Sequence, residues 1–120
     1  MVEGYPGAME HIAVMTAQQV KAWLDRGDDF LLIDVLPEAS YEKRHLPKAL
    51  NAPVHEDDFL ERVERLSDDG KRTTIVVYCS SHECSSSPMA AKALAQAGYS
   101  AVYDYEDGLA GWITAGYDFA

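Results

Sequence analysis

Apolar residues recur along this chain with two different spacings, which alternate from one segment to the next. Three short segments are rich in apolar, aromatic or β-branched residues, as is typical of buried strands: residues 30–35, 73–79 and 100–105. The segments between them carry apolar residues at helical spacing, which predicts amphipathic helices. Strands separated by helices indicate parallel pairing through crossover connections, and therefore a small layered α/β fold.

Capping residues predict where the helices begin and end. Thr16 and Gln19 form a capping box ahead of a first helix, which is expected to end at Gly27. Ser87 followed by Pro88 reads as the N-cap and first residue of an Ala-rich helix over residues 88–97. Further helices are expected over residues 37–45, from about Phe59 to an end by Gly70, and over residues 109–115 before Gly116, and residues 46–53 are expected to be irregular or extended.

Length and charge limit the domain count and the partners. A chain of 120 residues supports one core. We expect a single domain over residues 11–120, preceded by a flexible arm over residues 1–10, where no apolar period is sustained. Twenty acidic against ten basic residues give a formal charge of −10, which repels phosphate backbones and acidic lipid. Nucleic-acid and membrane partners are therefore not expected.

Cysteine usage and the N-terminus predict a cytoplasmic protein. The first residues lack the basic start and apolar stretch of a secretory signal. Two cysteines are too few for a disulfide framework, and a close pair in a reducing compartment more often indicates reactivity or metal binding. Both cysteines, Cys79 and Cys84, fall in the loop between the segment 73–79 and the helix over residues 88–97. Unpaired amides at a helix N-terminus favour a thiolate, the reactive form of cysteine.

Five sequence segments together resemble the rhodanese-like domains: LLIDV, YEKRHLPKALNAP, IVVYC, AAKALAQAGY and DGLAGWITAGY. The resemblance covers nearly the whole chain and implies a three-layer α/β fold, with a central, mainly parallel five-stranded sheet and helices on both faces. It also implies a nucleophilic Cys79 that takes a sulfane sulfur from a donor such as thiosulfate, forms a persulfide, and passes the sulfur to a thiol or cyanide. That chemistry requires no metal and no organic cofactor.

The chain departs from the common pattern of that family around the loop. Cys84 stands where the family has an arginine, and Leu36 replaces another arginine after Asp34. Arg44 and Lys48 replace the glycines that usually flank the His-Leu-Pro segment. No cation remains in the loop, whereas thiosulfate is a dianion that usually meets positive charge. A persulfide or polysulfide donor is therefore expected rather than thiosulfate.

The residues after Cys79 are expected to form the binding cradle: Ser80, Ser81, His82, Glu83, Cys84 and Ser85. Their backbone amides and hydroxyls suit a bound sulfur anion, and Glu83 is expected to point to solvent. Cys84 is either an unreactive thiol or a resolving thiol that closes a disulfide with Cys79. His82 either pairs with a thiolate or faces solvent.

Two polar residues outside the loop are expected to have structural roles near the site. Asp34 ends the first buried segment and is expected to orient the following loop through backbone hydrogen bonds. His45 is expected to support the fold ahead of Pro47. Trp23 and Trp112 lie on apolar helical faces and are expected in the core.

Other functions are possible for the same residues. Cys79, His82 and Cys84 could bind a metal, but they lack the paired spacing of structural zinc sites and a fourth ligand, so no metal is predicted. A phosphatase or arsenate reductase would need a cation to hold its oxyanion. The main alternative is a non-catalytic or redox-regulatory binding module, with Cys79 and Cys84 as a thiol switch. The oligomeric state is left open.

Overall fold

Five parallel strands form the centre of the molecule, in the order β1-β5-β4-β2-β3. The computed structural model describes residues 12–120, so the predicted arm over residues 1–10 lies outside it. The strands are β1 (Ile12–Met15), β2 (Leu31–Asp34), β3 (Leu50–Asn51), β4 (Thr74–Tyr78) and β5 (Ala101–Tyr105). The helices are α1 (Ala17–Arg26), α2 (Glu38–Lys43), α3 (Phe59–Leu66), α4 (Ser86–Gln96) and α5 (Gly108–Ala115), with a 3-10 turn at Gly70–Arg72. The expected parallel α/β fold is confirmed.

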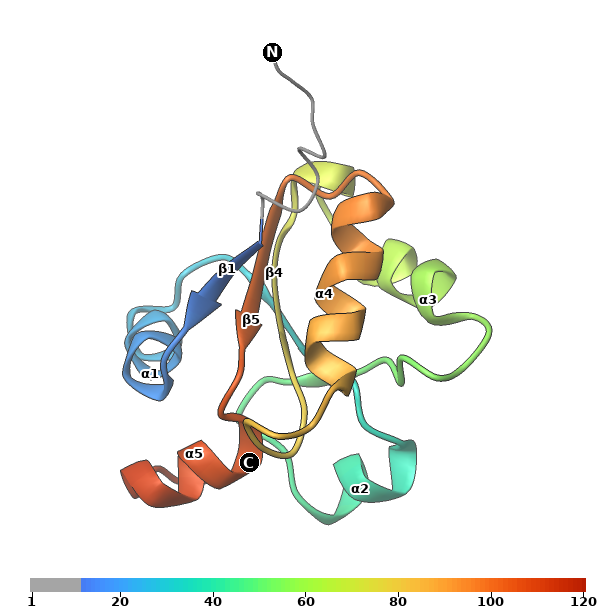
Figure 1. The fold of residues 1–120 in the computed structure, drawn as a ribbon. Coiled ribbons are helices and arrows are strands. Elements are labelled where there is room, and N and C mark those ends of the chain that lie inside the picture. Colours follow the sequence, from blue (N-terminus) through green and yellow to red (C-terminus); the bar gives the residue numbers. More distant parts are fainter. Residues whose placement is uncertain (1–11) are drawn as a thin grey trace.

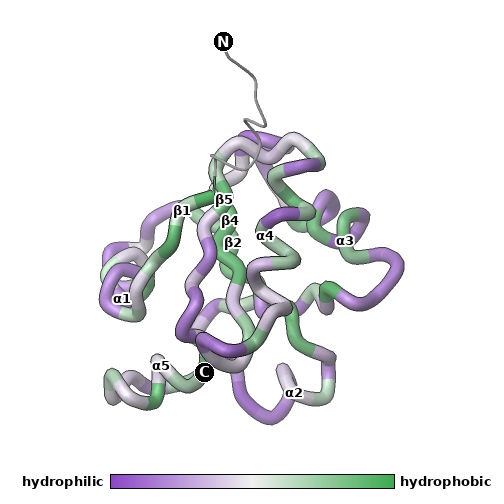
Figure 2. The backbone as a smooth tube through the Cα atoms, in the orientation of Figure 1, coloured by the Kyte–Doolittle hydropathy of each residue, from purple (hydrophilic) through white to green (hydrophobic). Residues whose placement is uncertain are grey.

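Helices cover both faces of the sheet, with α3 and α4 on one side and α1 and α5 on the other (Figure 1). Successive side chains of a strand point to opposite faces. Ile75 and Val77 of β4 accordingly pack in the core under α3 and α4, whereas Val76 and Tyr78 pack in the core under α1 and α5. Figure 2 shows β2, β4 and β5 as an apolar centre surrounded by polar connections. The sheet is therefore the middle of three layers.

Two strands were not predicted individually. β1 lies at one edge of the sheet and exposes Ala13 and Val14, so it has no buried apolar run to mark it. β3, at the other edge, pairs through only Leu50 and Asn51 within the segment expected to be irregular or extended. Both are edge strands whose pairing depends on a neighbouring strand rather than on their own sequence pattern.

The predicted ends of the first helix are confirmed, whereas the predicted start of the helix after the two cysteines is wrong. The Thr16–Gln19 capping box is present, and Gly27 ends α1 in the left-handed conformation with φ 72°. The prediction that Ser87 caps the next helix is wrong: α4 begins at Ser86, and Ser87 lies inside its first turn. The Ser87 hydroxyl instead donates to Asp104 Oδ1 at 2.7 Å, because its side chain is buried against β5.

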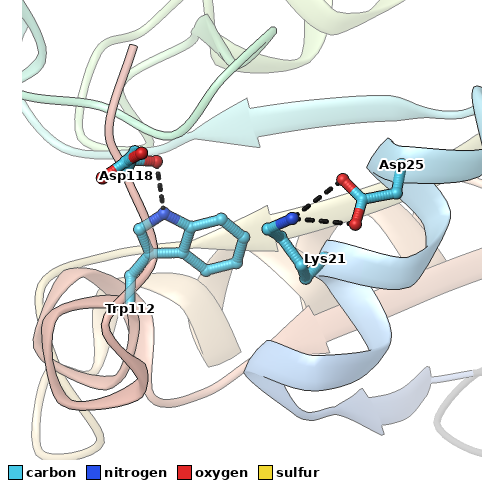
Figure 3. Close-up of polar contacts among 4 residues, drawn as sticks. All are labelled: Lys21, Asp25, Trp112 and Asp118. Atoms are coloured by element: carbon cyan, nitrogen blue, oxygen red, sulfur yellow. Dashed lines mark hydrogen bonds and ion pairs between the residues drawn. The ribbon is translucent and has the colours of Figure 1, made fainter.

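The C-terminal segment ties α5 to the body of the domain (Figure 3). Trp112 is fully buried, and its indole Nε1 donates to the backbone oxygen of Asp118 at 2.9 Å. Lys21 of α1 forms an ion pair with Asp25 at 2.8 Å, and its ammonium lies 5.5 Å from the centre of the Tyr117 ring. The Trp112 bond thus folds the C-terminal segment back onto α5, and the N-terminus of α5 reaches the loop after β4.

Within residues 12–120, no helix combines the length and the apolar composition needed to cross a bilayer.

Candidate active site at the carboxyl end of the sheet

Cys79 lies directly after β4, an interior strand that pairs with β2 on one side and β5 on the other. Residues Ile75 to Tyr78 of this strand are fully buried, and Cys79 is buried as well. In parallel sheets, ligands collect in the crevice outside the carboxyl ends of the strands. β4 therefore places the Cys79 thiol at the position where such a fold usually binds its substrate.

The loop over residues 79–87 is held from outside by the N-terminus of α5. The amide of Leu109 donates to the Cys79 carbonyl at 3.1 Å, and the amide of Ala110 donates to the Ser80 carbonyl at 2.9 Å. Gly108 permits this approach, because a Cβ there would lie 2.2 Å from the Cys79 carbonyl oxygen. The first two carbonyls of the loop are thus bound by α5, so they do not face the thiols.

The two thiols lie close together inside the loop. The Cys84 amide donates to the Ser81 carbonyl at 3.0 Å, a tight turn that brings residue 84 back over residue 79. Cys79 Sγ donates to the backbone oxygen of Cys84 at 3.7 Å, and both thiols are free. Cys79 is completely buried, whereas Cys84 is partly exposed. Cys84 is therefore the more accessible of the two residues.

The surroundings shift the pKa values of the two thiols in opposite directions. Burial raises the pKa of Cys79, and the Cys84 side chain raises it further, although the Ser87 hydroxyl and amide act the other way. Burial also acts to raise the pKa of Cys84, but the Cys79 thiol and the amides of Ser86 and Ser80 outweigh it and lower this pKa to about 6. Because the two thiols interact, they titrate as a pair rather than independently. The sequence led us to expect loop amides that favour a thiolate at Cys79, but the lowered pKa is that of Cys84.

Ser87 and Asp104 anchor the far side of the loop. Their hydrogen bond is buried and joins the first turn of α4 to β5. Burial raises the pKa of Asp104, and the Ser87 hydroxyl partly offsets this effect. This pair was not predicted, because nothing in the sequence pattern marks Ser87 as the partner of a buried carboxyl group. Gly108 was also missed as a site residue, although the DGLAGW segment contains it.

His82 and Glu83 point away from the thiols. Glu83 is exposed, as expected. His82 is also exposed, and its Nδ1 lies 3.8 Å from Glu106 Oε1 and 3.9 Å from Asp107 Oδ1. This position favours the solvent-facing alternative for His82 over an imidazolium paired with a thiolate. Among residues 12–120, no three potential ligand side chains gather as a metal site would require.

A groove of about 500 Å³ follows the outer side of the loop. Ser81, His82 and Glu83 form one wall, Asp107 and α5 form another, and the beginning of α1 closes it. The lining residues include two carboxylates and neither lysine nor arginine. The loop over residues 79–87 has no lysine or arginine either. The groove beside the loop is therefore acidic, which disfavours a dianionic ligand there.

Asp34 and His45 lie in the neighbouring connections rather than in the loop. Asp34 Oδ1 accepts the Leu36 amide at 2.9 Å, the loop-orienting contact expected from the sequence. Burial raises the pKa of Asp34, while the Leu36 amide and the Tyr78 hydroxyl lower it. His45 stacks on Tyr41, and its Nδ1 lies 2.8 Å from the Tyr41 carbonyl oxygen. Both residues support the connection after β2.

The remaining loop serines lie at the rim. Ser80 and Ser85 are exposed, and Ser81 and Ser86 are partly exposed. The Ser86 hydroxyl lies 3.3 Å from His55 Nε2. The backbone amides of Ser80 and Ser86 lower the pKa of Cys84, and so does the Ser86 hydroxyl.

Solved structures with the same fold include proteins of the sulfurtransferase class. The rhodanese-like domain of the Alr3790 protein from Anabaena has 26% identity and a TM-score of 0.75, covering 88% of this chain and 76% of its own. The polysulfide-sulfur transferase of Wolinella succinogenes has 16% identity and a TM-score of 0.72, covering 95% and 82%. Thiosulfate sulfurtransferase of Pseudomonas aeruginosa has 22% identity and a TM-score of 0.72, covering 95% of this chain and 21% of its own. The last two are similar in fold alone.

A curated relative and a family model extend the comparison to sequence. An HTH-type transcriptional regulator of Mycobacterium tuberculosis is 34% identical over 85 residues, which are 71% of this chain and 35% of the regulator. This chain thus spans about a third of the length of that relative. The model of the rhodanese-like domain matches residues 16–115, which include the whole loop and both helices that flank it. The chain belongs to the rhodanese-like family.

Proposed function

We propose that this protein is a sulfurtransferase that moves a sulfane sulfur from a small donor to a thiol or cyanide acceptor, through a persulfide on Cys79. The observation that carries the proposal is the placement of Cys79 at the carboxyl end of an interior strand, inside a loop whose amides face sulfur. Similarity to a polysulfide-sulfur transferase and a thiosulfate sulfurtransferase supports the same class of reaction.

The proposed chemistry needs only sulfur and main-chain groups. A thiolate attacks the outer sulfur of the donor, the donor S–S bond breaks, and the donor leaves as a thiolate. The resulting persulfide is anionic at neutral pH, and amides at a helix N-terminus stabilise negative charge there. An acceptor thiolate or cyanide then removes the outer sulfur and restores the cysteine. The reaction calls for neither metal nor organic cofactor.

We further propose that the donor is a persulfide or polysulfide rather than thiosulfate. The loop lacks lysine and arginine, and the groove beside it carries the carboxylates of Glu83 and Asp107. A dianion approaching this surface meets repulsion instead of the bidentate hydrogen bonds that an arginine offers. Both thiols are free, which fits the reducing, cytoplasmic setting that we propose for the protein.

The test is a sulfur-transfer assay with thiosulfate, glutathione persulfide and inorganic polysulfide as alternative donors. We expect turnover with the last two and at most weak turnover with thiosulfate. Cys79→Ser is expected to abolish turnover, whereas Ser67→Ala, a substitution in the turn after α3, is expected to leave it unchanged. Wild-type protein that transfers sulfur from none of these donors would contradict the proposal.

A second candidate function is a non-catalytic or redox-regulatory module. The observation that favours it is the complete burial of Cys79, together with the match to part of a transcriptional regulator. In that case the Cys79–Cys84 pair would act as a thiol switch, closing a disulfide under oxidation. Inactivity with every donor, combined with a disulfide that forms under mild peroxide, would favour the module over the enzyme.

A further inference from the structure

The two thiols of the loop differ in their access to solvent. Cys79 is fully buried, and its Sγ is directed at the backbone oxygen of Cys84, 3.7 Å away. Cys84 is partly exposed and packs against the edge of the core that contains Cys79. A donor arriving from solvent therefore reaches the sulfur of Cys84 before that of Cys79.

The main-chain environment also differs between the thiols. The amides of Ser80 and Ser86 both act on the Cys84 sulfur, from opposite ends of the loop. The turn between Ser81 and Cys84 holds the Cys84 side chain in that position. The side chain of Cys84 thus sits in the part of the loop that favours negative sulfur.

From this arrangement we infer that Cys84 is a second catalytic thiol, which takes the sulfane sulfur from the donor first and passes it to Cys79. The inference rests on the proposed sulfurtransferase function and changes its order of events. Cys79 remains the residue from which the acceptor takes sulfur. Cys84 is the residue that meets the donor.

The sequence of steps balances without an oxidant or a reductant. The Cys84 thiolate attacks the terminal sulfur of a persulfide RSSH, the S–S bond breaks, RS⁻ leaves, and a Cys84 persulfide forms. The Cys79 sulfur then attacks the terminal sulfur of that persulfide, so the new S–S bond breaks and Cys84 departs as a thiolate. The proton of the Cys79 thiol goes to RS⁻, giving RSH. The products are RSH, a Cys79 persulfide and the original Cys84 thiolate.

Thiol chemistry favours this direction of transfer. A thiol of low pKa is the better leaving group, and one of higher pKa is the stronger nucleophile once it loses its proton. The pKa of Cys84 is lowered to about 6 and that of Cys79 is raised, so sulfur passes from the good leaving group to the strong nucleophile. Transfer also needs the two cysteines to be neighbours, and Cys79 Sγ lies 3.7 Å from the backbone oxygen of Cys84.

The test compares where sulfur resides in wild type, Cys79→Ser and Cys84→Ser after brief exposure to glutathione persulfide. The proteins are alkylated, their intact masses are measured, and the added sulfur is located by peptide mapping. We expect Cys79→Ser to trap one added sulfur on Cys84, and Cys84→Ser to load Cys79 at least about tenfold more slowly than wild type. Ser67→Ala, which lies in the turn after α3 and keeps both thiols and the whole loop, is the control and should load as wild type does.

The opposite pattern would overturn the inference and leave the proposed function intact: no sulfur on Cys79→Ser, and wild-type loading of Cys84→Ser. Wild-type protein that takes up no sulfur would instead overturn the proposed function, and this inference with it.

A second measurement on wild type alone covers the case in which a variant fails to fold. With less than one equivalent of iodoacetamide at neutral pH, we expect Cys84 to be alkylated first, and preferential alkylation of Cys79 would contradict the inference.

Discussion

The connections that follow the neighbouring strands β2 and β4 are stabilised in different ways. After β2, side chains bind the backbone: Asp34 accepts the Leu36 amide, and Asn51 donates to the carbonyls of Asp34 and Leu36. After β4, the backbone of α5 binds the loop carbonyls instead. The amides of the first connection are used for structure, whereas those of the second remain available to sulfur. The two neighbouring connections are thus ordered by opposite means, by side chains after β2 and by backbone groups after β4.

The largest expected effect comes from Gly108→Ala, which attacks the support of the loop after β4. The new Cβ would lie 2.2 Å from the Cys79 carbonyl oxygen, and Gly108 has φ 58°. We expect a loss of stability of about 3 kcal/mol or more, together with loss of sulfur transfer, because α5 must move away from the loop. Urea unfolding measures the first effect and the transfer assay the second.

Gly116→Ala is the matched control for that substitution. Gly116 also has positive φ, 79°, but a Cβ there would meet nothing within 4 Å. Only the conformational cost remains, about 1 kcal/mol, with sulfur transfer retained. Equal losses in the two variants would show that contact between α5 and the loop is not what supports the site.

Ser87→Ala is expected to cost about 1.5–3 kcal/mol, because it removes a hydrogen bond to a buried carboxyl group. Burial raises the pKa of Asp104, and without the Ser87 hydroxyl that pKa rises further. The ionised Asp104 carboxylate is then disfavoured. The loss of stability relative to wild type should therefore be largest at neutral pH and should shrink as the pH falls through the pKa of Asp104. Exposed Ser85→Ala should stay within about 0.5 kcal/mol of wild type at every pH.

Asp34→Asn tests the connection after β2 through its pH dependence. Burial raises the pKa of Asp34, so folding favours the protonated carboxyl and wild type loses stability as the pH rises through that pKa. The asparagine can still accept the Leu36 amide but has no charge to bury. We expect the variant to gain on the order of 1 kcal/mol relative to wild type at neutral pH, and to lose this gain in acid. A difference independent of pH would contradict a buried, ionised Asp34.

Lys48→Gly should have the smallest effect, a gain of up to about 1 kcal/mol, because Lys48 is held at φ 66° where glycine is unstrained. Arg44→Gly is the comparison. Arg44 has φ −171°, an extended conformation that needs no glycine, and its guanidinium lies 5.0 Å from the centre of the Phe119 ring. That variant should lose stability, by about 0.5–1 kcal/mol. Thermal unfolding of both variants decides whether only one of these two positions prefers glycine.

Local signals in the sequence predicted the elements that bury a continuous apolar run or carry a capping motif. β2, β4 and β5 and the Thr16 cap belong to this group. β1 and β3 could not be predicted individually, because edge strands of four and two residues are defined by their partners. Within the site, the sequence placed both cysteines in one loop. It could not predict that Ser87 binds Asp104, since that contact joins residues brought together only by the β4–β5 pairing.

The most direct test of the account is a pH titration of thiolate absorbance in the native protein, with Cys79→Ser and Cys84→Ser to assign each step. The central claim is that main-chain amides, without a cation, favour negative sulfur in the loop after β4. We predict one thiolate that appears with a midpoint of about 6, assigned to Cys84, and a second that appears only in alkali, assigned to Cys79. Two thiols that both titrate at about pH 8–9, like free cysteine, would contradict the claim.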